Sequence, residues 1–137
     1  MDLKEKFGTV GAMETDGVDV HLGGDAFVTV RRAGGSNLAY LRETRRMYSK
    51  HKRAIDAGSI EGAEAERLLM DVYAATIVTG WRGVELDGAA LEFNRANVTR
   101  LFVEVPEVFR IIKEEAERIA NFQAAQVDEQ GKDSRTI

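Results

Sequence analysis

The segment Leu68–Val78, with the sequence LLMDVYAATIV, constrains the fold most, because it is apolar on nearly every side when it forms a helix. Only Asp71 and Thr76 interrupt it. A helix without a polar face has to be buried, so other elements must surround this one. The chain has 137 residues, of which 44% are hydrophobic and 31% charged, a balance typical of one soluble globular domain. We therefore predict a central helix over 59–79, with Ser59 as its N-cap.

A β-hairpin is predicted ahead of this helix. In the first strand, Val18, Val20 and Leu22 alternate with polar residues, as in a strand with one buried face. The second strand, 26–31, is β-branched and aromatic, and glycines mark the turn at 23–25. Because an isolated hairpin is marginal in water, we expect it to pack on helices or on a second subunit.

Three further helices are predicted from capping residues and apolar periodicity. They are 37–56, begun by Ser36 or Asn37, 94–104, begun by Asn94, and 106–125, begun by Pro106. The first of them carries an apolar stripe, a pattern that normally faces a core. The stripe consists of Leu38, Leu41, Tyr48 and Ile55.

The predicted fold class is α+β and mainly α-helical, with the N-terminal β-hairpin packed on a bundle of about four helices. Residues 1–16 are expected to form a flexible N-terminal arm, 17–125 a single domain, and 126–137 a disordered C-terminal tail. The side chains expected in the core are Leu69, Val72, Ile77, Trp81, Phe93, Leu101, Ile112 and Ile119.

Residue types that usually carry catalysis are scarce. The chain has no cysteine and two histidines, which excludes thiolate catalysis and cysteine-based metal sites. It also lacks a G-x-S-x-G motif, a Walker A loop and a G-x-G-x-x-G loop. Asp19 and His21 share a strand face that a metal could use, but the solvent face of a hairpin accounts for them better. We expect no enzymatic activity, no cofactor and no metal.

A basic stretch is the main candidate for a binding site. Residues 31–53 contain eight cations and one anion, Glu43, in a chain whose net charge is −4. Helical spacing spreads four of the cations over the outward face of helix 37–56: Arg42, Arg45, Arg46 and Lys50. They could solvate the helix, bind an acidic protein surface or bind nucleic acid. The acidic pI of about 5.3 and the lack of aromatic residues among these cations disfavour nucleic acid.

The block from Thr76 to Phe122 resembles the tail assembly chaperones of long-tailed bacteriophages and related prophages. A tryptophan segment after a helix leads into a D-G turn, an aromatic residue and an asparagine open a short helix, and a proline begins the last helix. The residues that carry this pattern are Trp81, Asp87, Gly88, Phe93, Asn97, Pro106 and 120–122. Upstream, V-x-V-R-R-A-G-G-S-N-L-A-Y at 28–40 is similar to their hairpin and basic helix, so the resemblance covers about residues 17–125.

The resemblance implies a cytoplasmic assembly factor in the bacterial host, without catalytic residues. Such a protein binds and solubilises the tape measure protein, helps to recruit the major tail protein, and is not retained in the virion. We expect a homo-oligomer that contacts its partner through the four cations together with Tyr40 and Trp81, and we expect neither nucleic acid nor a membrane as a partner. Trp81 could instead act as a lid on the core.

Two alternatives stay open: a structural tail or neck protein of the virion, and a small nucleic-acid-binding regulator that uses residues 31–53. Many members of the family also use a ribosomal frameshift near the end of the gene. The tripeptide Gln130-Gly131-Lys132 is compatible with a slippery heptamer, because CAG-GGA-AAG can encode it.

Overall fold

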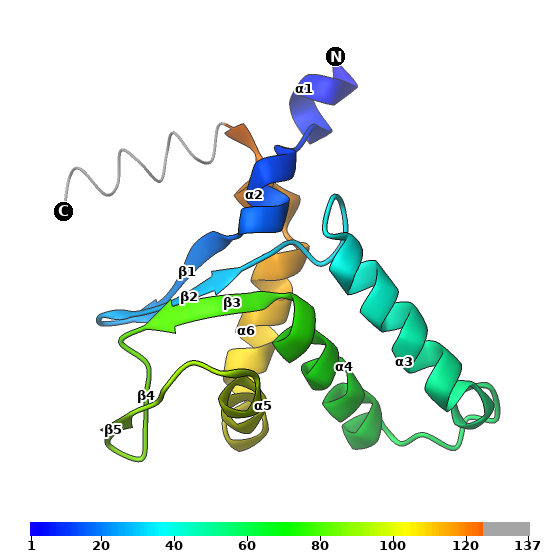
Figure 1. Cartoon of the computed structure of the whole chain (residues 1–137). Coiled ribbons are helices and arrows are strands. Elements are labelled where there is room, and N and C mark those ends of the chain that lie inside the picture. Colours follow the sequence, from blue (N-terminus) through cyan, green and yellow to red (C-terminus); the bar gives the residue numbers. More distant parts are fainter. Residues whose placement is uncertain (125–137) are drawn as a thin grey trace.

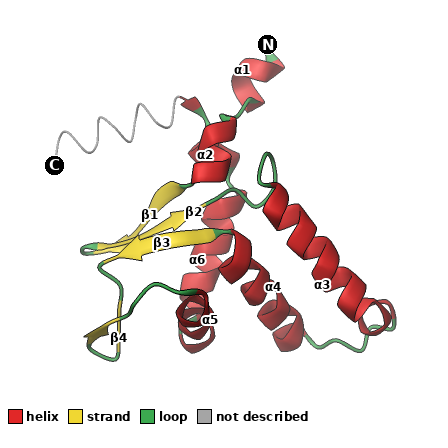
Figure 2. Ribbon diagram, in the orientation of Figure 1, coloured by secondary structure: helices red, strands yellow, loops and turns green. Residues whose placement is uncertain are grey.

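The predicted hairpin is present, and a third strand extends it into an antiparallel sheet of order β1-β2-β3 (Figure 1). The strands are Val18–Gly23 (β1), Ala26–Val30 (β2) and Val78–Arg82 (β3). The structure is a computed structural model that describes residues 1–124. Helices make up most of the remainder (Figure 2), so the predicted α+β, mainly helical class is confirmed.

The helices and the remaining strands follow one another along the chain with short connections. They are Leu3–Phe7 (α1), Gly11–Asp16 (α2), Leu38–Asp56 (α3), Gly62–Thr76 (α4), Glu85–Leu86 (β4), Ala89–Ala90 (β5), Arg95–Glu104 (α5), Pro106–Glu117 (α6) and the 3₁₀ turn Ile119–Phe122 (η1). Within residues 1–124, no helix combines the length and the apolar character that crossing a membrane would require.

Local capping signals fix several helix starts as the sequence predicts. The Asn37 side chain accepts a hydrogen bond from the backbone N–H of Tyr40, and the Asn94 side chain accepts one from that of Asn97. Pro106 is the first residue of α6. Helix α4 is an exception, because it begins at Gly62 and not after Ser59.

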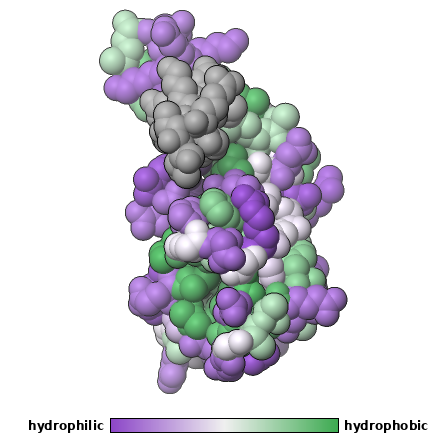
Figure 3. Space-filling view, turned by 90° about the vertical axis from the view of Figure 1, so that its left-hand side faces the viewer, coloured by the Kyte–Doolittle hydropathy of each residue, from purple (hydrophilic) through white to green (hydrophobic). Residues whose placement is uncertain are grey.

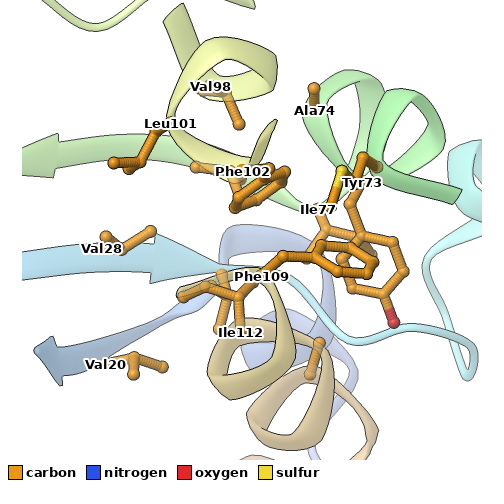
Figure 4. Packing of buried hydrophobic residues seen from close by; sticks show 14 of the residues in the cluster. Val20, Val28, Tyr73, Ala74, Ile77, Val98, Leu101, Phe102, Phe109 and Ile112 are labelled. Carbon is orange, nitrogen blue, oxygen red and sulfur yellow. The ribbon is translucent and has the colours of Figure 1, made fainter. Parts of the chain in front are cut away.

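The core lies between one face of the sheet and the helices α4, α5 and α6. Valines from β1 and β2 form the sheet side of the core, and α6 packs across them. On the helical side, the Phe109 ring lies edge-on to Tyr73 and to Phe102, with centroid distances of 5.3 and 5.1 Å (Figure 4). The core prediction is confirmed for Val72, Ile77, Leu101 and Ile112, which are buried. It is only partly right for the half-buried Leu69, Trp81 and Ile119, and wrong for Phe93, which is 36% exposed.

The prediction of one helix over 59–79 is wrong at its C-terminal end. Helix α4 stops at Thr76, and the chain continues as strand β3. The run Thr76–Thr79 is β-branched throughout, which suits a strand better than a helix. In β3, Val78 lies opposite Val30 and Trp81 opposite Val28, so the strand adds to the core face of the sheet.

The last helix also ends earlier than predicted. Helix α6 stops at Glu117, Arg118 adopts an extended conformation, and η1 turns Phe122 into the core, where it is fully buried. The carbonyl oxygen of Phe122 accepts a hydrogen bond from the backbone N–H of Val10. This contact ties η1 to the N-terminal part of the chain.

The N-terminal segment differs from the flexible arm expected for 1–16. Residues 11–16 form α2, which packs on η1, and Glu14 within it is buried. The inner face of the hairpin is covered within the same chain, so the hairpin does not need a second subunit to bury its valines. The tail predicted for 126–137 lies outside the described residues.

Tyr73 gives a stability prediction, because its side chain is fully buried and its hydroxyl has no hydrogen-bond partner within residues 1–124. Burial raises the pKa of this hydroxyl well above its ordinary value. A buried polar group without a partner costs about 1–3 kcal/mol. We therefore expect Tyr73→Phe to raise the free energy of unfolding by about 1 kcal/mol, measured by urea denaturation. The control is Tyr40→Phe, because Tyr40 is only half-buried. A Tyr73→Phe variant that is less stable than wild type would contradict the prediction.

Candidate functional site

Helix α3 is the most exposed long element of the described chain. It packs mainly on α4, on the side of α4 that faces away from the sheet (Figure 1). None of its 19 residues is buried. Its inner side is half-buried and includes Tyr40, Thr44, Met47 and His51. The Tyr40 ring lies edge-on to Tyr73, with a centroid distance of 6.0 Å.

Three of the four residues in the apolar stripe predicted on this helix lie on its outer side, so the expectation that the stripe faces the core is wrong for them, whereas Ile55 is half-buried. Leu38, Leu41 and Tyr48 are 54%, 38% and 42% exposed. Together with two cations they form a row spaced alternately by three and four residues, which we call the outer seam. The outer seam consists of Leu38, Leu41, Arg45, Tyr48 and Lys52. This spacing is the one by which coiled-coil helices pack on each other.

The packing of α3 on α4 determines which side of α3 is exposed. The core is already closed by the sheet together with α4, α5 and α6, so α3 only has to cover one side of α4. The inner row of α3, with Tyr40 and Met47, provides that cover. The apolar residues of the outer seam therefore stay partly exposed, at 38–54%.

The C-terminal end of the outer seam is held by polar contacts. The Tyr48 hydroxyl donates to Asp56 at 2.9 Å, and Lys52 Nζ donates to the same carboxylate at 2.8 Å. Hydrogen bonds from Lys52 and Tyr48 lower the pKa of Asp56, and the bond to Asp56 raises the pKa of Tyr48. A kink at His51 (φ −111°, ψ 15°) divides the helix just before Lys52. The straight part of the outer seam thus runs from Leu38 to Tyr48.

The structure divides the four predicted cations between two sides of α3. Arg42 and Arg45 are exposed beside and within the outer seam, and within residues 1–124 neither forms an ion pair. Arg46 and Lys50 instead line a cavity of about 140 Å³ toward α4, together with Arg95 at the start of α5. Arg46 pairs with Glu43, and this hydrogen bond lowers the pKa of the Glu43 carboxyl.

The two predicted aromatic contacts lie elsewhere. Tyr40 is on the inner side of α3. Trp81 is half-buried on the core face of β3, where its Nε1 donates to the carbonyl oxygen of Leu91 at 2.8 Å and its ring lies edge-on to Phe93. The face seen in Figure 3 is mostly polar, with an apolar area in its lower half. The structure therefore does not bring Tyr40 or Trp81 together with the outer cations.

Sequence reasoning missed the apolar members of the outer seam as candidate contacts. Leu38, Leu41 and Tyr48 form a stripe in the sequence, but a stripe alone does not show whether the core or a partner covers it. Their alternation with Arg45 and Lys52 is the signal that distinguishes the two cases, because two cations in the same row disfavour burial. An exposed apolar row flanked by cations can bind an amphipathic helix that carries acidic side chains.

Comparison with known proteins identifies a family. The model of the family described as YdaY prophage protein matches residues 34–133, which is well over half of the chain and includes all of α3. Comparison with the curated proteins and with the solved structures gives no match. The expectation of a phage protein is confirmed in this coarser form. The chain belongs to the YdaY prophage protein family.

Proposed function

We propose that this prophage protein is a tail assembly chaperone. It binds the tape measure protein, keeps it soluble, helps to recruit the major tail protein, and is not retained in the virion. The observation that carries the proposal is the outer seam of α3, a partly exposed apolar and basic row on a 19-residue helix. The resemblance of residues 17–125 to such chaperones and the membership of a prophage family support the same role.

A helix is the partner that fits the outer seam best. The three- and four-residue spacing of Leu38, Leu41 and Tyr48 matches the rows through which two helices pack side by side. Arg45 lies within the row, so the facing positions of the partner should carry Asp or Glu. The resemblance to tail assembly chaperones implies a partner that is long, helical and prone to aggregation, which an amphipathic row on α3 could cover.

A single outer seam gives a weak contact. The straight part from Leu38 to Tyr48 is about 15 Å long at a rise of about 1.5 Å per residue. Three apolar side chains over that length bury little surface. Many copies bound along one long partner would provide a large total affinity, while each contact could still be displaced by a tail subunit. This combination suits a factor that has to leave during assembly.

The test is co-expression of the chain with the tape measure protein, with the soluble fraction of the latter as the readout. We expect the variant Leu38→Glu/Leu41→Glu to reduce that fraction to the level seen without the chaperone. The matched control is Val103→Glu/Ile111→Glu, which alters two residues of similar exposure, 43% and 44%, on other helices. The control should keep the partner soluble, and equal loss in both variants would argue against a role of α3.

The cations provide a second comparison within the same assay. We expect Arg42→Glu/Arg45→Glu to weaken binding most at low salt, because exposed charges act through association rate and are screened. Arg46→Glu/Lys50→Glu should have a smaller effect, because Arg46 is already paired with Glu43 and both side chains border the cavity toward α4. Mass spectrometry of purified particles that detects the chain would instead indicate a structural tail protein. A DNA mobility shift with a steep salt dependence would indicate a regulator.

A further inference from the structure

Strand β1 forms an open edge of the sheet. Within residues 1–124 it pairs with β2 alone, and β3 lies on the other side of β2 (Figure 1). An open edge presents unpaired backbone N–H and C=O groups, and proteins that avoid edge-to-edge association block it with charged side chains, above all lysine, with proline or with β-bulges. The strand Val18–Gly23 contains neither lysine nor proline; its one acid is Asp19, and its register shifts only near the turn, between His21 and Gly23.

We propose that β1 pairs with β1 of a second copy of this chain, antiparallel and in a register centred on Val20. The pairing joins two three-stranded sheets into one continuous six-stranded sheet. It uses backbone hydrogen bonds, as in the addition of a peptide strand to a sheet edge. This inference does not rest on the proposed function.

The register follows from the side chains of β1. A two-fold axis at Val20 places Val18 opposite Leu22 of the second copy, on the core face, and Asp19 opposite His21 of the second copy, on the solvent face. Apolar residues then meet apolar residues, and an acid meets a base. A register centred on Asp19 would place two carboxylates opposite each other, and one centred on His21 would place two imidazoles opposite each other. A shift by one residue would bring core-facing side chains against solvent-facing ones.

On the solvent face of the sheet, three side chains stack on one another across the strands, and the last of them lies on the β1 edge. The Arg82 guanidinium lies over the Phe27 ring, 4.2 Å from its centroid, and the Phe27 ring stacks on His21 at 4.5 Å. The other ring face of His21 points away from β2. His21 Nε2 donates to the carbonyl oxygen of Gly24 at 2.7 Å, which leaves Nδ1, a donor when the ring carries both protons, for a carboxylate across the edge. Asp19 of the second copy would extend the row at this point.

The carboxylate of Asp19 retains capacity for such a contact. One of its oxygens accepts a hydrogen bond from the Thr29 hydroxyl at 2.8 Å, and the other accepts one from Arg82 at 3.0 Å. A carboxylate can accept about four hydrogen bonds. In Figure 1, β1 and α3 lie on opposite sides of the molecule, so the paired sheet would leave the outer seam of both copies accessible.

The absence of cysteine allows a direct test of the register. The variants Asp19→Cys and His21→Cys are oxidised separately and as an equimolar mixture, and disulfide-linked dimers are quantified on non-reducing gels. Opposite residues have Cβ atoms about 4.5–5.5 Å apart and diagonal ones about 7–8 Å, and a disulfide needs about 3.5–4.5 Å, so opposite cysteines can link after a small backbone adjustment and diagonal ones cannot. We expect at least about fivefold more linked dimer in the mixture than in either single variant. The control Ser49→Cys, exposed on α3, should link no more than either single variant.

A charge exchange tests the same contact without a covalent bond. His21→Asp places two carboxylates opposite each other and should weaken the dimer at least about tenfold, measured by sedimentation equilibrium. Adding Asp19→His to that variant restores an acid opposite a base and should recover most of the affinity. A wild-type chain that stays monomeric at high concentration, equal linking in the single cysteine variants, or a double exchange that does not recover affinity would each overturn the proposal.

Discussion

Replacing Phe109 with alanine is expected to lower the free energy of unfolding by about 3–5 kcal/mol. The Phe109 ring is 2% exposed and lies between Tyr73 and Phe102 in edge-on contact with both. It thereby links α4, α5 and α6 at one point of the core (Figure 4). Its removal leaves a cavity and also removes two aromatic pairs, each worth about 0.5–1.5 kcal/mol beyond the buried area.

The matched control for Phe109 is Ile111 on the same helix, which is 44% exposed. Ile111→Ala should cost less than about 1 kcal/mol, because an exposed position loses little burial. Urea denaturation followed by far-ultraviolet circular dichroism measures both variants, and the fluorescence of Trp81 provides an independent probe. A loss below about 1 kcal/mol for Phe109→Ala would show that the core is not organised around this ring.

Features set by local chemistry were predictable from the sequence. The hairpin follows from the alternation of valines in β1 and from the glycines of its turn. The starts of α3, α5 and α6 follow from Asn37, Asn94 and Pro106, each of which provides a cap or a fixed φ that the adjacent backbone requires. These signals act over three or four residues; Ser59 is the exception, because its hydroxyl donates to the carbonyl oxygen of Ala54 at the end of α3, and α4 begins only at Gly62.

Features set by distant contacts were not predictable in the same way. The segment after Thr76 continues the apolar pattern of α4, and periodicity alone does not separate a buried helix from a buried strand. The deciding contact is the pairing of Val78 and Trp81 with β2, about fifty residues earlier in the chain. The turn of η1 depends in the same way on α2, which receives Phe122 from the other end of the described chain.

In the candidate site, the exposure of the charged side chains was predictable from the sequence, whereas the exposure of the apolar side chains was not. Exposure of Arg42 and Arg45 follows from their charge, because charged side chains seldom lie in a core. Exposure of Leu38 and Tyr48 does not follow from residue type. Their exposure results from the packing of α3 on α4, because α3 contacts α4 through a different row of side chains, which includes Tyr40 and Met47. A helix with apolar residues on two sides therefore needs the tertiary structure to show which side is left for a partner.

The other large expected effect concerns the buried ion pair that holds α2 against the loop before α3. Glu14 is 2% exposed, and its carboxylate accepts hydrogen bonds from the Arg32 guanidinium and from the backbone N–H of Ser36. Gly35 passes close to the same carboxylate with a φ of 53°, and a Cβ atom there would overlap it. We expect Glu14→Ala to lower the free energy of unfolding by about 2–4 kcal/mol, because it leaves Arg32 without its partner. Glu64→Ala, at an exposed position of α4, should cost less than about 0.5 kcal/mol.

The same pair should make stability depend on pH. Burial alone would raise the pKa of Glu14, but the hydrogen bonds from Arg32 and Ser36 outweigh it and hold the pKa below the ordinary value of 4.5. The unfolded chain therefore binds this proton at a higher pH than the folded chain does. The contribution of Glu14 is complete above the ordinary value and is lost as the pH falls through the lower folded value. Between about pH 5 and pH 3, wild type should lose more stability than Glu14→Gln, whereas parallel curves for the two proteins would show that the ionised carboxylate is not what holds α2 in place.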